Sequence, residues 1–117
     1  FKFFTNSKFS TTVSSCTAGL HLACLALNLK KGDEVIVPAM THTATSHAVE
    51  YTGAKAVFAD IDYPEGNINV EYLKKKITSK TKAIIVVHMA GYPCNMDEIL
   101  NIYDNKNSKL DYYIELD

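Results

Sequence analysis

Residues 34–60 read EVIVPAMTHTATSHAVEYTGAKAVFAD, and this stretch decides the fold class. Glu34–Val37 is an apolar run of strand length, and a second run of this kind follows at Lys55–Asp60. Between them, Thr41–Thr52 has the length and composition of a helix. When a helix joins two strands of one sheet, the strands run parallel, because the helix returns the chain to the end of the sheet at which the first strand began. The stretch therefore predicts one strand-helix-strand unit of a parallel sheet.

The rest of the chain repeats this alternation of strands and helices. Further strands are predicted at Phe9–Val13, Ala83–His88 and Tyr112–Leu116, and further helices at Ala18–Leu29, Val70–Ile77 and Met96–Tyr103. Such alternation is typical of an α/β domain with a mostly parallel sheet flanked by helices. No repeat, linker or low-complexity segment interrupts residues 1–117, so we expect no domain boundary within them.

Composition and charge exclude several classes of function. The 117 residues carry 12 basic and 13 acidic side chains. Because these charges nearly cancel, we expect the protein to bind neither nucleic acid nor a membrane surface. The longest apolar runs are shorter than the roughly 20 residues of a membrane span. Three cysteines without a C-x-x-C pair indicate a reduced cytoplasmic protein. His42 and His47 lack the spacing of a helical zinc site, so no metal is expected.

The turn Ser14–Gly19 is the first candidate for a binding site. It lies between a predicted strand and the start of a helix, where unpaired backbone N–H groups and the positive end of the helix dipole favour an anion. The hydroxyl groups of Ser15 and Thr17 add two donors. A serine or threonine at this position more often only caps the helix, so both interpretations stay open on local sequence alone.

The order of the segments is more specific. The run SSCTAGLHLACLALNLKKGDEVIVPAMTHTATSHAVEYTGAKAVFADID at residues 14–62 resembles the DegT/DnrJ/StrS family of nucleotide-sugar aminotransferases. The resemblance continues through TSKTKAIIVVHMAGYPCNMDEI at residues 78–99. It implies the large domain of an aspartate-aminotransferase-like enzyme of fold type I that depends on pyridoxal 5'-phosphate (PLP). Residues 1–117 would then be a fragment of that PLP-binding domain.

The same resemblance assigns residues to the cofactor. The family's phosphate-binding turn falls on Cys16, Thr17 and Ala18, and the residue that stacks on the pyridine ring falls on His42. The aspartate that pairs with the pyridine nitrogen is Asp117, although the family's usual Glu-Asp pair reads Glu115-Leu116-Asp117 here. Because side chains alternate along a strand, Leu116 stays open as the occupant of that position.

The resemblance also implies the reaction and its partners. Family members transfer an amino group from an amino acid, commonly glutamate, to a keto-sugar linked to a nucleotide, and they generally work as homodimers. The reaction requires a lysine that forms a Schiff base with the cofactor, and no residue of this chain matches that motif. We therefore expect no catalytic residue in the fragment, which should be inactive alone. A PLP-dependent sugar dehydratase and a non-catalytic family member are the alternatives.

Overall fold

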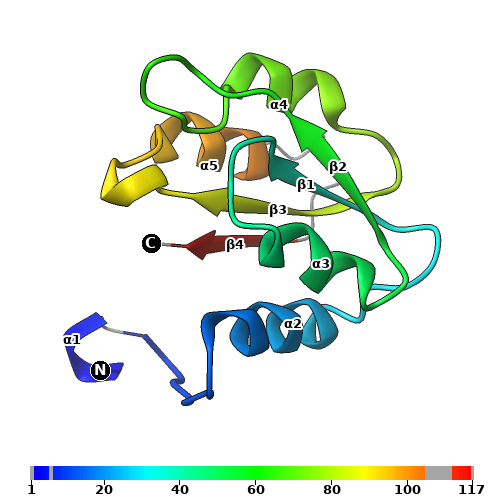
Figure 1. Ribbon diagram of the computed structural model, residues 1–117, viewed down its shortest axis with the longest axis vertical. Coiled ribbons are helices and arrows are strands. Elements are labelled where there is room, and N and C mark those ends of the chain that lie inside the picture. Colours follow the sequence, from blue (N-terminus) through cyan, green and yellow to red (C-terminus); the bar gives the residue numbers. More distant parts are fainter. Residues whose placement is uncertain (1, 6, 105–111, 117) are drawn as a thin grey trace.

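Helices and strands alternate along the chain in the computed structural model, which describes residues 2–5, 7–104 and 112–116 (Figure 1). The helices are α1 (Lys2–Thr5), α2 (Cys16–Ala26), α3 (Ala44–Glu50), α4 (Val70–Lys76), α5 (Met96–Asp104) and the short 3-10 turn η1 (Met89–Gly91). The strands are β1 (Glu34–Pro38), β2 (Lys55–Ala59), β3 (Thr81–Val87) and β4 (Tyr112–Leu116).

The four strands form one sheet in the order β2-β1-β3-β4, and every neighbouring pair is parallel. The strand order reverses at β1. The chain passes through α3 to β2 on one side of β1, then crosses through α4 to β3 on the other side. The carboxyl ends of β1 and β3 therefore meet at a switch point, which is where open α/β sheets bind their ligands.

Two apolar layers cover the two faces of the sheet, as the alternation of side chains along each strand requires. Val35 and Ile85 belong to a cluster on the side of α2 and α3, whereas Ile36 and Ile84 belong to a cluster on the side of α4 and α5. Figure 1 shows these two pairs of helices on opposite sides of the sheet. Because β1 and β3 contribute to both clusters, they read as continuous apolar runs in the sequence.

The sequence-based prediction of an α/β domain with a parallel sheet is confirmed, and the strands at Glu34–Val37, Lys55–Asp60, Ala83–His88 and Tyr112–Leu116 form within a few residues of their predicted bounds. The predicted helix at Ala18–Leu29 begins and ends earlier, as α2. It ends where Asn28 adopts the left-handed conformation, with φ of 54°, which an asparagine tolerates.

The predicted strand at Phe9–Val13 is wrong, because this segment is neither helix nor strand in the structure. It lies beside α2 and outside the four-stranded sheet (Figure 1), so its β-branched residues have no strand to pair with. Val13 instead contacts the start of α2, where its Cγ2 lies 3.3 Å from the position that a Cβ on Gly19 would occupy. The turn at Ser14–Gly19 therefore follows an extended segment rather than a buried strand.

Across the part of the chain that the structure describes, no helix is both long and apolar enough to cross a membrane.

We predict a graded loss of stability at Ile85, which is fully buried between α2, α3 and the sheet. Ile85→Ala should lower the free energy of unfolding by about 2–5 kcal/mol, because it removes buried methyl groups and leaves a cavity. Ile85→Val, the matched control, should cost only about 0.5–1.5 kcal/mol. Urea unfolding followed by circular dichroism measures both, and equal costs would contradict the placement of Ile85 in a close-packed core.

Candidate functional site

A hollow of about 340 Å³ opens at the switch point between β1 and β3. Three segments form its wall: the first turn of α2, the loop from β1 into α3, and the end of β3. Its lining residues are Cys16, Thr17, Leu20, Thr41, His42, Ala44, Thr45, Val87 and Met89. The volume lies near the lower end of the roughly 300–1,000 Å³ that is usual for sites of small ligands and cofactors.

The first turn of α2 presents free donors to this hollow. Ser15 is the N-cap residue, and its Oγ accepts a hydrogen bond from the N–H of Ala18 at 3.1 Å. The N–H of Gly19 donates to the carbonyl oxygen of Ser15 at 3.0 Å. The N–H groups of Cys16 and Thr17 lie too early in the helix for an intrahelical acceptor. Such N–H groups, together with the positive end of the helix dipole, are the kind of donors that can hold an anion.

Ser15 and Thr17 therefore have different roles, although the sequence could not separate them. The hydroxyl of Ser15 is used by the cap. Among the described residues, the hydroxyl of Thr17 has no hydrogen-bond partner, and Thr17 lines the hollow. The capping interpretation is thus correct for Ser15, and Thr17 is left as the side-chain donor for a ligand.

His42 lines the same hollow from the loop that follows β1. Its Nδ1 accepts a hydrogen bond from the N–H of Ala44 at 3.1 Å, at the start of α3. The ring nitrogen that accepts this bond is therefore turned toward the start of α3. The hydrogen bond also fixes the ring against the helix, which is useful for stacking on a flat ligand.

The hollow thus brings together Cys16, Thr17 and His42, three of the five residues assigned from the sequence. Ala18 does not line it, and its N–H is occupied by Ser15. Asp117 lies outside the described residues. The strand before it, β4, pairs with β3 so that Leu116 lies opposite Val87, one of the lining residues.

Sequence analysis did not find the remaining lining residues. The hydroxyl groups of Thr41 and Thr45 are hydrogen-bonded to each other at 3.0 Å, and Val87 and Met89 form the wall at the end of β3. Their position directly after the carboxyl ends of β1 and β3 was the available signal, since ligands bind there in parallel sheets. His88 is buried and does not line the hollow; its Nδ1 accepts from the N–H of Cys94 at 3.0 Å.

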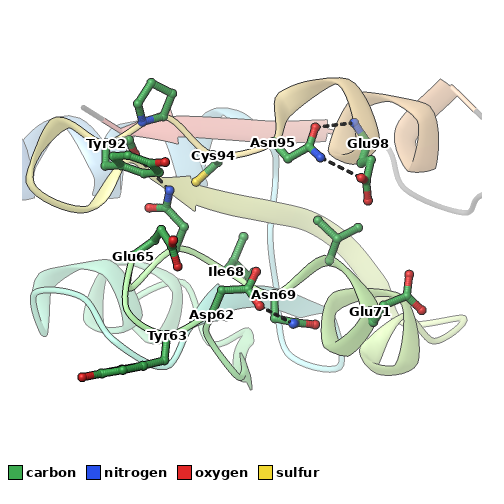
Figure 2. Close-up of a pocket in the computed structure, with 13 residues that line it drawn as sticks. Asp62, Tyr63, Glu65, Ile68, Asn69, Glu71, Tyr92, Cys94, Asn95 and Glu98 are labelled. Atoms are coloured by element: carbon green, nitrogen blue, oxygen red, sulfur yellow. Dashed lines mark hydrogen bonds between the residues drawn. The ribbon is translucent and has the colours of Figure 1, made fainter.

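A second hollow of about 550 Å³ lies on the α4 and α5 side, between the loop after β2 and the segment that leads into α5. Figure 2 shows carboxylates around it, with Asn69 turned to Asp62 and Asn95 turned to Glu98. Its carboxylates are Asp62, Glu65, Glu71 and Glu98. Negative side chains disfavour an anionic ligand. No group of side chains within the described ranges could hold a metal ion.

The pKa of one of these carboxylates, that of Glu71, is shifted. Lys74 Nζ donates to Glu71 Oε1 at 2.6 Å within α4, and this hydrogen bond lowers the pKa of the Glu71 carboxyl and raises the pKa of Lys74. Both side chains are exposed, so their pair is a surface feature of the helix. The second hollow also includes the first turn of α4, but four carboxylates surround it, whereas the lining of the first hollow contains no acidic residue.

Comparison with known proteins shows the family of the chain. The model of the DegT/DnrJ/EryC1/StrS aminotransferase family matches residues 1–110. The chain belongs to this family. Over 102 residues it is 53% identical to an uncharacterized protein of Methanocaldococcus jannaschii, a match that covers 87% of this chain and 26% of that protein. It is 46% identical over 100 residues to the GDP-perosamine synthase of Escherichia coli O157:H7, covering 86% and 28% respectively.

A solved structure gives the same result for the fold. A GDP-4-keto-6-deoxymannose-3-dehydratase with a trapped PLP-glutamate adduct superposes with a TM-score of 0.87 and 37% identity, covering 98% of this chain and 31% of the dehydratase. Relatives of this kind are PLP-dependent enzymes of fold type I, so the fold and the cofactor class expected from the sequence are confirmed. The chain spans about a quarter to a third of the length of these relatives.

The residues of the first hollow fit this cofactor. Two free N–H groups and one hydroxyl at the start of α2 match the acceptor oxygens of a phosphate dianion. The rest of the lining is largely apolar apart from the threonine pair and His42, as a pyridine ring requires. His42 adds a flat, fixed ring at the same wall.

Proposed function

We propose that the complete protein is a PLP-dependent aminotransferase. It transfers an amino group from an amino acid, which we take to be glutamate, to a keto-sugar linked to a nucleotide. The observation that carries the proposal is the meeting of Cys16, Thr17 and His42 around one hollow at the switch point of a fold type I sheet. The similarity to GDP-perosamine synthase supports the substrate class.

In this proposal the start of α2 holds the cofactor phosphate. The N–H groups of Cys16 and Thr17 and the hydroxyl of Thr17 donate to its oxygens, whereas the N–H of Ala18 is bound to Ser15 Oγ and supports the turn. Ser15 does not touch the phosphate but keeps the first turn of α2 in place through its cap. The dipole of the 11-residue helix adds favourable electrostatic energy for the negative charge.

The ring side of the site is assigned to His42 and Asp117. His42 stacks on the pyridine ring while its Nδ1 remains bound to Ala44. Asp117 pairs with the pyridine nitrogen and stabilises its protonated form, because a neighbouring carboxylate favours a positive charge. When bound, PLP acts as the electron sink of the amino transfer. The Schiff-base lysine is assigned to a part of the protein outside these 117 residues, so this chain supplies the cofactor-binding half of the site.

Sugar dehydration is the second candidate function. It is favoured by the dehydratase whose structure matches 98% of this chain with a TM-score of 0.87. Both reactions use the same cofactor and the same class of nucleotide-linked keto-sugar, so the phosphate turn and His42 serve either one. We further propose that the complete protein is a homodimer in the cytoplasm, a reducing compartment in which thiols rarely form disulfides.

Product analysis tests which reaction the complete protein performs. With PLP, glutamate and a GDP-linked 4-keto-6-deoxy sugar, we expect an aminated sugar and one 2-oxoglutarate for each sugar consumed, measured by mass spectrometry. Deoxygenated sugar without stoichiometric amination would instead establish the dehydratase. Absence of both products, in protein that retains the lysine and binds PLP, would contradict an enzymatic function on this substrate class.

Thr17→Ala and Ser15→Ala should separate ligand binding from helix capping. Thr17→Ala should weaken PLP affinity about 10- to 100-fold, because it removes one hydrogen bond to a charged group, and should leave the free energy of unfolding nearly unchanged. Ser15→Ala should lower that free energy by about 0.5–2 kcal/mol through loss of the cap. Fluorescence titration and urea unfolding measure the two effects. Unchanged affinity in Thr17→Ala would remove Thr17 from the site.

A further inference from the structure

One asparagine side chain holds both ends of the turn that follows β3. The Oδ1 of Asn67 accepts a hydrogen bond from the N–H of Met89 at 2.9 Å, and its Nδ2 donates to the carbonyl oxygen of Tyr92 at 3.0 Å. Asn67 belongs to the loop after β2, 22 and 25 residues earlier in the chain. Its side chain is 6% exposed, so these bonds are shielded from water. The amide thus bridges the beginning and the end of η1.

The turn needs such support because its backbone is unusual. Ala90 has φ of 52° and Gly91 has φ of 79°, so two successive residues adopt the left-handed conformation. That conformation is unfavourable for alanine because its Cβ approaches the following carbonyl group. Within the turn, the N–H of Tyr92 donates to the carbonyl oxygen of Met89 at 2.9 Å. Asn67 is the bridge from another loop that keeps this conformation in place.

The position of the turn matters because Met89 is part of the cofactor hollow. Met89 lines that hollow with Thr17 and His42, whereas Asn67 does not line it and belongs to the wall of the second hollow. The side chain of Met89 also lies close to Gly66. A Cβ on Gly66 would lie 3.1 Å from Met89 Cγ and 3.4 Å from Met40 Sδ. Side chains from the loops after β1 and β3 therefore lie next to Gly66 in the loop after β2. In the same loop, Asn67 accepts the hydrogen bond of the Met89 N–H.

We propose that Asn67 is a positioning residue of the cofactor site, which acts by holding Met89 against the ring side of the hollow. The inference rests on the proposed function, in that the hollow binds PLP. Without the Asn67 bonds, the turn would populate conformations in which Met89 leaves the wall, and apparent affinity falls with the fraction of competent protein. The two Asn67 bonds involve no residue of α2, so we expect phosphate binding at the start of α2 to depend less on this turn than binding of the ring does.

Asn95, which is exposed, offers a control for the loss of an amide at the second hollow. Among the described residues, its side chain bonds only to Glu98 at the start of α5 (Figure 2). Replacing either residue with alanine removes one amide of equal size from one hollow. Only the change at Asn67 removes a contact with Met89.

The first readout requires no cofactor. In the complete protein, Asn67→Ala should increase the hydrogen-exchange rate of the Met89 amide about tenfold, because that N–H loses its acceptor, while amides within β3 stay protected. Asn95→Ala should leave the Met89 rate unchanged. Asn67→Asp keeps an acceptor oxygen for Met89 but loses the donor to Tyr92, so it should retain most of the protection and serves if Asn67→Ala does not fold.

The second readout separates the ring side from the phosphate side. Asn67→Ala should raise the Kd for pyridoxamine 5'-phosphate about tenfold, because two hydrogen bonds that order the turn are lost. Asn67→Asp should raise it by a smaller factor. The Kd for inorganic phosphate should stay the same in both variants. A general loss of protein stability would instead weaken the binding of both ligands to the same extent.

The outcomes distinguish this inference from the proposed function. If the wild-type protein does not bind pyridoxamine 5'-phosphate, the proposed function fails and the inference fails with it. If the wild-type protein binds this ligand and the Asn67 variants bind it equally well, the inference alone is overturned. Equal weakening by Asn95→Ala, or equal loss of phosphate and pyridoxamine 5'-phosphate binding in Asn67→Ala, would also overturn it.

Discussion

The burial of β1 on both faces, between β2 and β3, is the constraint on which the rest of the structure depends. Val35 and Val37 face one helix layer while Ile36 faces the other, so no side of this strand is available to water. Each neighbour must run parallel to it because each connection passes through a helix. All carboxyl ends then lie at one edge, and the loops after β1 and β3 meet the first turn of α2 there. The position of the first hollow therefore follows from the way in which the helices cover both faces of the sheet.

The sequence predicted the helices and strands best where burial and local pattern agree. The apolar runs of β1 and β3 and the amphipathic α4, with Leu73 buried, all form close to their predicted bounds. The strand predicted at Phe9–Val13 does not form, although the segment has a β-branched composition. A strand needs a neighbouring strand to pair with, and composition alone does not show whether the sheet provides one. The left-handed backbone of Ala90 was equally beyond prediction, since its support comes from Asn67 in a different loop.

The same distinction applies to the site. Cys16, Thr17 and His42 were found through a resemblance of ordered motifs, and the structure brings them to one hollow. The separate roles of Ser15 and Thr17 could not be read from sequence, because either hydroxyl could have capped α2. Met89 and Val87 belong to the wall only because β3 lies beside β1. The assignment of Asp117 stays a prediction. In our proposal, this chain holds the cofactor and another part of the complete protein supplies the reacting lysine.

The most direct measurement of the central claim is protection of Cys16 from alkylation. Cys16 is exposed at the start of α2, whereas Cys24 and Cys94 are buried and burial raises the pKa of the Cys24 thiol, so both serve as slow internal references. The complete protein is treated with iodoacetamide, and peptide mass spectrometry follows each cysteine. Saturating pyridoxamine 5'-phosphate should slow the modification of Cys16 strongly, and pyridoxamine without the phosphate should not. Equal rates with and without the phosphorylated ligand would contradict a cofactor-phosphate site at the start of α2.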